Sequence, residues 1–175
     1  KGLTSGYQPL GATIFSEQVW EVISAPGYGR YFAHGFTYTG HPVACRAALK
    51  NIEIIEREGI LEHVRKVGPY FLQQLKTLEQ LPIVGEVRGS HFMVCIENVA
   101  RKESRSLFPD DVDIGHRITD ECASRGVLIR PIGHLNVLSP SLILTVDEID
   151  RIVTTLRDGI SAVMMDLQSE GLWRR

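Results

Sequence analysis

The sequence predicts an α/β protein in two parts. Residues 43–79 carry apolar side chains at helical spacing, whereas residues 82–98 mostly alternate apolar and polar side chains, as strands do. Residues 145–148 (TVDE) have the form of a capping box before a further helix. A change of pattern near residue 80 therefore separates one strand, a loop and long helices from a β-β-α-β-β-α unit.

The first part opens with a glycine-rich loop and an apolar run at residues 12–15, which favours a buried strand. Residues 17–23 predict a short helix with Ser16 as its N-cap and Pro26-Gly27 after its end. Residues 24–42 have no helical period and predict a long ordered loop, a feature that compact domains usually keep for function. One strand and two helices cannot bury their apolar faces alone, so this part needs a sheet from elsewhere.

The second part is predicted to form a sheet with two helices. Residues 88–90 (RGS) are expected to make a bend or bulge in the first β segment. Asp111 or Asp113 is expected to cap a helix that Gly126 ends. The remaining segments are predicted as a surface loop at residues 99–111, strands at 127–129 and 136–144, and a final helix at 149–167.

Composition narrows the class of protein. Hydrophobic residues make up 43% and charged residues 23%, with a net charge of −2, which is typical of a soluble globular protein and favours no nucleic-acid partner. No apolar run is long enough to span a bilayer, so no membrane partner is expected. The sequence has no C-x-x-C pair among Cys45, Cys95 and Cys122 and no H-x-x-x-H among its histidines, so we expect no bound metal. We also expect the thiols to be reduced and the protein to be cytoplasmic.

The first candidate motif is KGLTSGYQPLGA at residues 1–12. A lysine amine can attack a carbonyl when desolvation or a nearby cation lowers its pKa. Gly2, Gly6 and Gly11 would let a ligand approach the backbone closely. On these grounds alone, an ordinary solvated lysine remains the plainer alternative.

The second candidate motif is HGFTYTGHP at residues 34–42. Thr37 and Thr39 offer hydroxyls, and the loop runs into a helix that begins near Pro42. Hydroxyls and free amides near a helix start suit an anion such as phosphate, although a tight loop with a threonine cap is the alternative. We interpret His41 as a structural residue that holds this loop against the helix.

Taken together, the two motifs resemble those of class III pyridoxal-phosphate-dependent aminotransferases. The resemblance covers the whole chain, including VRG at 87–89, LFPD at 107–110 and GVLIRPIG at 126–133. Within the class it is most similar to ω-aminotransferases, which use an amine or ω-amino acid and pyruvate. The resemblance implies a fold type I transferase, with residues 1–79 ending the large cofactor domain and residues 80–175 forming the C-terminal small domain.

The resemblance also assigns roles to residues. Lys1 matches the lysine that forms the internal aldimine with pyridoxal 5′-phosphate and moves a proton between substrate and cofactor. Thr37 matches a threonine that binds the cofactor phosphate from the neighbouring subunit of a homodimer, and Phe36 lies in the same contact. Arg130 matches an arginine that binds a substrate carboxylate and swings out for an uncharged amine; a surface charge is the alternative. Residues that complete the cofactor site precede the lysine in the family, so we expect the chain to follow them in a longer polypeptide.

The implied function is transfer of an amino group from an amine or ω-amino acid to a keto acid such as pyruvate. Residues 89–91 (GSH) depart from the glycine-rich form of the family and Ser141 replaces a proline, which puts the exact substrates in doubt. A class III aminomutase or decarboxylase, or a non-catalytic module that keeps the fold, are the alternatives. Arg130 favours transamination, and an assay of amino transfer to pyruvate against carbon dioxide release separates the two enzymes.

Overall fold

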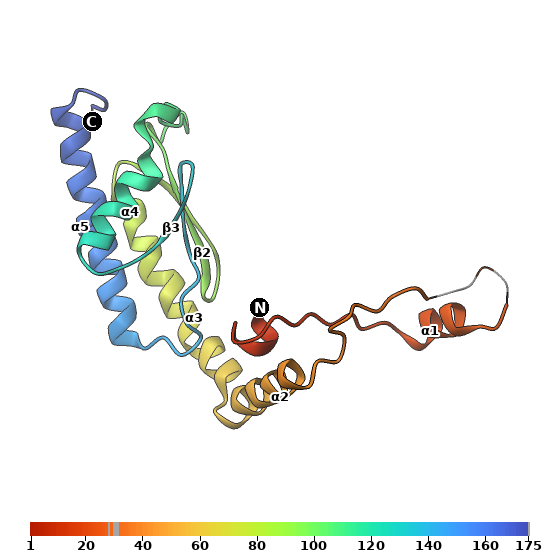
Figure 1. Ribbon diagram of the computed structural model, residues 1–175. Helices are drawn as coiled ribbons and strands as arrows, with labels where there is room; N and C mark the ends of the chain where they lie inside the picture. Colours follow the sequence, from red (N-terminus) through yellow and green to blue (C-terminus); the bar gives the residue numbers. More distant parts are fainter. Residues whose placement is uncertain (28, 30–31, 175) are drawn as a thin grey trace. The chain divides into compact units, whose positions relative to one another are not determined.

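The computed structural model describes residues 1–27, 29 and 32–174, and it divides into two compact units, Lys1–Gly59 and Ile60–Arg175. Both units are drawn in Figure 1. The units part between helices α2 and α3, whereas the sequence analysis put the domain boundary at residues 79–80. That boundary refers to the domains of the larger fold and stays a prediction.

Unit 1 holds the 3₁₀ helix η1 (Gly2–Thr4), the helix α1 (Glu17–Ser24) and the helix α2 (Pro42–Arg57). Pro42 occupies the first turn of α2, where its missing N–H costs no hydrogen bond. The His41 ring caps the same end, with Nδ1 accepting from the Ala44 N–H at 3.5 Å. The structural interpretation of His41 is therefore confirmed. Ser16 lies at the predicted N-cap of α1, without a side-chain bond.

The strand predicted at residues 12–15 is wrong. This segment is extended but unpaired, and Ile14 is 94% exposed. A strand needs a neighbour to accept its backbone hydrogen bonds, and the described part of unit 1 contains none. The predicted loop at 24–42 is confirmed in its described interior, with a turn at residues 37–40, but Ser24 still belongs to α1 and Pro42 already to α2; residues 28, 30 and 31 lie outside the description. Only Thr4, Ala44 and Ala48 are buried in the described part of unit 1.

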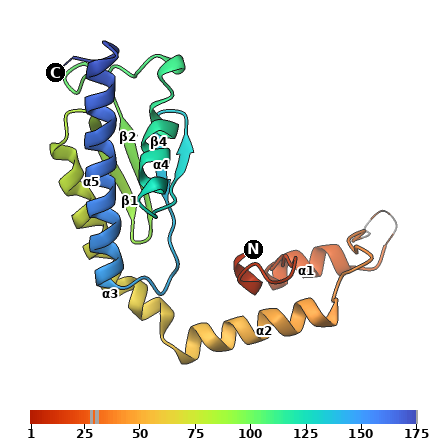
Figure 2. The same cartoon turned by 60° about the vertical axis from the view of Figure 1, so that its left-hand side comes forward.

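Unit 2 is a four-stranded antiparallel sheet covered on one face by three helices (Figures 1 and 2). The strand order is β1-β2-β4-β3. The predicted β-β-α-β-β-α order is confirmed, with a further helix, α3, before it. The bounds are β1 Val84–Ser90, β2 Met93–Asn98, β3 Arg130–Ile132, β4 Leu135–Leu138, α3 Ile60–Lys76, α4 Ile114–Ser124 and α5 Val146–Ser169, with 3₁₀ helices η2 (Thr77–Gln80) and η3 (Asp110–Val112).

The core of unit 2 lies between the sheet and the helices. Alternation along the strands sends Val87, Val94 and Ile96 to the helix side, where they are buried with Phe71 of α3 and Leu156 of α5. The capping box at the start of α5 is confirmed. The Thr145 N–H donates to Glu148 Oε2 at 2.8 Å, and the Glu148 N–H donates to Thr145 Oγ1 at 3.3 Å.

Several predicted elements of unit 2 are displaced. β1 continues through residues 88–90, and its irregularity lies between Val84 and Glu86 instead. Residues 127–129 are not a strand, because β3 begins only at Arg130, where it pairs with β4. The strand predicted at 136–144 ends at Leu138, before Pro140. The predicted loop at 99–111 buries Phe108 and contains η3, and Asp113 stands at the N-cap of α4 without a cap bond.

Both hairpins of the sheet turn through two residues. Gly133 and His134 connect β3 to β4, and Gly133 has a φ of 56°, which suits a glycine. His91 and Phe92 connect β1 to β2, and His91 has a φ of 49°. A residue with a Cβ pays for this left-handed conformation in strain, so His91 is a strained position in an exposed turn.

We expect His91→Gly to stabilise unit 2. Relief of the left-handed strain is worth about 1 kcal/mol, from which the greater freedom of glycine in the unfolded chain subtracts part. Thermal unfolding should therefore show a Tm higher by a few degrees. Gly133→Ala is the matched control: its Cβ would meet nothing within 4 Å, so it should lower the Tm by strain alone. A lower Tm for His91→Gly would show that the contacts of His91 with Ser90, at 2.7 Å, and with Gly68 of α3 outweigh the strain.

Candidate functional site

Lys1 is exposed at the start of a backbone turn that is held by hydrogen bonds. The Gly6 N–H donates to Lys1 O at 3.0 Å, the Ser5 N–H to Gly2 O at 3.3 Å and the Tyr7 N–H to Thr4 O at 3.1 Å. Ser5 and Gly6 both have positive φ, which closes the turn. The backbone of Lys1 is thus held by a hydrogen bond, whereas its side-chain amine makes none with the described residues.

Two residues that the sequence analysis missed complete this turn. Asn51 of α2 donates from Nδ2 to Gly2 O at 3.0 Å and to Leu3 O at 3.1 Å. Thr4 is 2% exposed, and its hydroxyl donates to Gln8 O at 2.5 Å. No local signal marks Asn51, because its partners lie 48 and 49 residues away in the sequence.

The turn at residues 36–40 divides the two threonines by role. The Phe36 N–H donates to Thr39 Oγ1 at 2.8 Å and the Thr39 N–H donates to Phe36 O at 2.9 Å, so Thr39 is structural. Thr37 is exposed, and its hydroxyl makes no hydrogen bond within the described residues. An anion could therefore meet the hydroxyl of Thr37, whereas the Phe36 N–H is already used. Phe36 itself is 76% exposed.

The face of the sheet that the helices leave open carries side chains in rows. The register pairs Arg88 with Cys95, Cys95 with Val137, and Val137 with Arg130. Directly paired residues in an antiparallel sheet point to the same face, so these four side chains form one row across all four strands. Arg88 and Arg130 lie at the two ends of the row.

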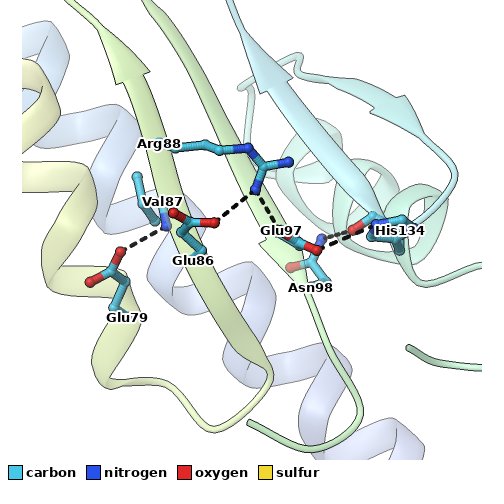
Figure 3. Close-up of polar contacts among 7 residues, drawn as sticks. All are labelled: Glu79, Glu86, Val87, Arg88, Glu97, Asn98 and His134. Atoms are coloured by element: carbon cyan, nitrogen blue, oxygen red, sulfur yellow. Dashed lines mark hydrogen bonds and ion pairs between the residues drawn. The ribbon is translucent and has the colours of Figure 1, made fainter. Parts of the chain in front are cut away.

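The two arginines differ in their surroundings. Arg88 forms an ion pair with Glu97 and a second with Glu86 at 3.2 Å (Figure 3). The hydrogen bond that Arg88 donates to Glu97 raises the pKa of the Arg88 guanidinium above its ordinary value. His134 approaches the other oxygen of Glu97, with Nε2 at 3.8 Å from Oε1. Arg88 is therefore neutralised by its neighbours.

Arg130 is exposed and makes no side-chain hydrogen bond or ion pair to any residue that the structure describes. It lines a cavity of about 210 Å³ whose other walls are largely apolar and include Leu128, Val137 and Pro140. An unpaired guanidinium beside apolar walls can bind a carboxylate in a bidentate manner while the walls contact an aliphatic or aromatic chain. Of the two arginines in the row, Arg130 is thus the one available to a ligand.

Two of the three thiols, Cys95 and Cys122, and the metal-binding side chains of the described residues offer no second centre. Burial raises the pKa of the Cys122 thiol to about 11, and burial also raises the pKa of Cys95 against the opposing effect of Arg88. Both thiols therefore stay protonated near neutral pH. Histidine, cysteine and acidic side chains form no metal-binding group in the described ranges. No helix described here combines the length and apolarity needed to cross a bilayer.

The predicted site residues fall in both units. Lys1, Phe36 and Thr37 belong to unit 1, and Arg130 belongs to unit 2. Within each unit these residues are exposed. Their roles stay predictions.

Comparison with known proteins decides the family. Residues 1–160 match the family Aminotransferase class-III. The chain belongs to this family. It is 40% identical over 163 residues to a probable mitochondrial γ-aminobutyrate transaminase 3 of Oryza sativa subsp. indica, covering 93% of this chain and 32% of that protein. It is 37% identical over 158 residues to a putrescine–pyruvate aminotransferase of Pseudomonas aeruginosa, covering 90% of this chain and 34% of that protein.

Solved transaminases share the fold of this class III chain, which confirms fold type I. The aminotransferase of Vibrio fluvialis in its PMP-bound form has a TM-score of 0.85 at 35% identity, over 94% of this chain and 37% of that one. An amine transaminase of an uncultivated Pseudomonas species in its PLP-bound form has a TM-score of 0.88 at 41% identity, over 93% and 37%. The chain spans about a third of the length of the curated relatives that it matches.

The donor groups of unit 1 fit pyridoxal phosphate, the cofactor of this family. The aldehyde needs a primary amine on a fixed backbone, and Lys1 supplies one. The phosphate needs uncommitted donors, and Thr37 supplies a hydroxyl.

Proposed function

We propose that this chain is part of an aminotransferase that moves an amino group from an amine or ω-amino acid to a keto acid, with pyruvate as the acceptor. The proposal rests on one observation: Lys1 has an exposed amine, and the backbone turn that bears it is held by hydrogen bonds. Relatives named as γ-aminobutyrate and putrescine–pyruvate transaminases support the substrate class.

The residues of the chain divide the work of the proposed reaction. Pyridoxal phosphate, when bound, supplies the aldehyde that takes up the amino group and the ring that withdraws electrons. Lys1 Nζ would hold the cofactor aldehyde and would move the proton at the reacting carbon of the substrate. Asn51 keeps the Lys1 turn in place through the carbonyls of Gly2 and Leu3.

Thr37 is proposed to bind the cofactor phosphate across a homodimer boundary. An exposed aromatic row beside it supports such an interface. Ring centroids follow one another at 6.0 Å from Trp20 to Phe15, 6.0 Å to Phe32, 5.5 Å to His34 and 5.2 Å to Phe36. Exposed apolar side chains that gather in this way favour a protein partner.

Arg130 is proposed to bind the carboxylate of the keto acid. One pocket must accept an amine without a carboxylate next to the reacting carbon and an acid that has one. A fixed buried arginine would face the amine unpaired, at a cost in free energy, whereas an exposed edge-strand arginine can return to solvent. The planar guanidinium matches the carboxylate better than a lysine would.

We expect borohydride reduction of the cofactor-loaded enzyme to attach the pyridoxyl group to Lys1. Lys50 is a poorer nucleophile because its amine is paired with Glu53 Oε1 at 2.6 Å. Peptide mass analysis identifies the labelled residue, and Lys1→Arg is the matched control, which should abolish the label. A label on Lys50, Lys66 or Lys76 would overturn the assignment.

We expect Thr37→Ala to loosen the cofactor. Loss of one charge-assisted hydrogen bond costs about 1.5–3 kcal/mol, or roughly tenfold to a hundredfold in affinity. Equilibrium dialysis of pyridoxal phosphate against the variant measures this change. Tyr38→Phe removes the neighbouring exposed hydroxyl and should leave the affinity unchanged. Full cofactor affinity in a monomeric enzyme would contradict the shared site.

We expect Arg130→Ala to slow the half-reaction with pyruvate and to spare the half-reaction with a simple amine. Removing one partner of a hydrogen-bonded charge pair costs about 2 kcal/mol or more, a loss of roughly thirtyfold. Single-turnover absorption spectroscopy separates the two halves. Arg88→Ala, at the other end of the same row, is the control and should affect neither. Equal losses in both halves for Arg130→Ala would assign this residue to the fold or the cofactor.

A further inference from the structure

Two asparagines lie in the core of unit 2, on the face of the sheet that the helices cover. Asn98 of β2 and Asn136 of β4 are both 0% exposed. Asn98 Nδ2 donates to Asn136 Oδ1 at 2.7 Å and to His134 O at 2.8 Å. Figure 3 shows Asn98 reaching the turn residue His134.

The second asparagine connects the sheet to α4. Asn136 Nδ2 donates to Gly115 O at 2.9 Å and to Thr119 Oγ1 at 3.2 Å. Gly115 also permits close contact, because a Cβ at this position would lie 2.2 Å from Gly133 O. The β3–β4 turn is thus held from β2 by Asn98, and β4 is held to α4 by Asn136.

This pair contributes little to stability. Buried polar groups lose their hydration, and Asn98 Oδ1 has no hydrogen-bond partner in the described structure. An apolar pair of the same shape would be about as stable or more so. The polar pair instead selects one register, because a slip of one residue would move Asn136 to the open face and break its three side-chain hydrogen bonds.

The register of β4 decides where Arg130 lies. β3 is a three-residue edge strand whose only strand neighbour in the sheet is β4, and Arg130 pairs with Val137, next to Asn136. Residues 127–129 before it have no regular structure, and Leu128 is 87% exposed. Pairing with β4, together with packing of the neighbouring Ile129 against the core, constrains the backbone of Arg130.

We propose that Asn98 and Asn136 are positioning residues for Arg130: they fix the β3–β4 hairpin so that the guanidinium meets the carboxylate of the keto acid. This inference rests on the proposed function of Arg130. If the inference holds, replacing the pair disturbs the position of Arg130 and leaves the free energy of unfolding unchanged.

The double variant Asn98→Leu with Asn136→Leu tests the inference without leaving an orphaned carbonyl. In this variant His134 O still accepts a hydrogen bond from the backbone N–H of residue 98, at 3.0 Å. Gly115 O still accepts one from the hydroxyl of Thr119, at 2.8 Å. We expect an unchanged or higher Tm. In the cofactor-free protein, hydrogen exchange should be faster at the amides of Ile132 and Leu135, which flank the turn.

In the cofactor-loaded enzyme, the double variant should raise the half-saturating concentration of pyruvate by roughly tenfold or more, since misplacement by about 1 Å can cost up to a hundredfold. The value for a simple amine should stay within about twofold. Thr77→Val is the matched control: it removes the 2.7 Å bond from Arg157 in the same unit without touching the hairpin, and both values should hold.

Three outcomes would overturn the inference. Unchanged exchange and unchanged pyruvate dependence would show that the pair positions nothing. Equal losses with both substrates and a lower Tm would show a purely structural role. If Arg130→Ala leaves the pyruvate half-reaction intact, the proposed role of Arg130 fails and the positioning role fails with it. This failure is distinct from a failure of the asparagine pair, because Arg130→Ala should leave hydrogen exchange in the β3–β4 hairpin as in the wild type.

Discussion

Pairing of four short strands in one register decides which side chains of unit 2 can reach a ligand. The same alternation that buries Val94, Ile96 and Leu138 against the helices puts Cys95, Val137 and Arg130 on the open face. A shift of one residue in β4 would turn Val137 toward the helices and Leu138 toward the open face, so the core and the ligand-facing row depend on the same register. Hydrophobic burial therefore fixes the place of a charged side chain that takes no part in the core.

Unit 1 follows a different principle. The residues buried in the described part of unit 1 are Thr4, Ala44 and Ala48. The Lys1 turn is instead fixed by hydrogen bonds, in which the carbonyls of residues 1–4 all accept a donor. Directional bonds of this kind fix a backbone at low cost in buried area. They hold the backbone of Lys1 while its amine stays exposed.

Local signals in the sequence predicted the helices well and the strands poorly. The capping box at Thr145 and the proline at residue 42 act within one helical turn, so a sequence pattern can reveal them. The strand ends depend on partners far away in the chain: residues 127–129 are as apolar as a strand, yet pairing begins at Arg130 because the turn lies at Gly133 and His134. The β1–β2 turn went unrecognised because His91 occupies a position that usually needs glycine.

The same distinction applies to the site. The resemblance to a family supplied Lys1, Phe36, Thr37 and Arg130, since their motifs are contiguous. The residues that support them carry no such motif. Asn51 acts on carbonyls 48 and 49 positions earlier, and Asn98 acts on Asn136 across 38 positions. Only folding brings these amides to their partners, and a lone asparagine in a sequence gives no sign of it.

Electrostatics explains why one arginine of the row is free and the other is not. Three steps of about 4.8 Å across the sheet put the backbones of Arg88 and Arg130 roughly 14 Å apart. That distance exceeds the screening length of about 8 Å at physiological ionic strength. Glu86 and Glu97 belong to the neighbouring row, on β1 and β2, where both contact Arg88. Glu97 lies two strands from β3, roughly 10 Å across the sheet, so it competes only weakly for Arg130. A carboxylate that enters the open face meets one uncompensated guanidinium, at the edge strand where the backbone also leaves room for it.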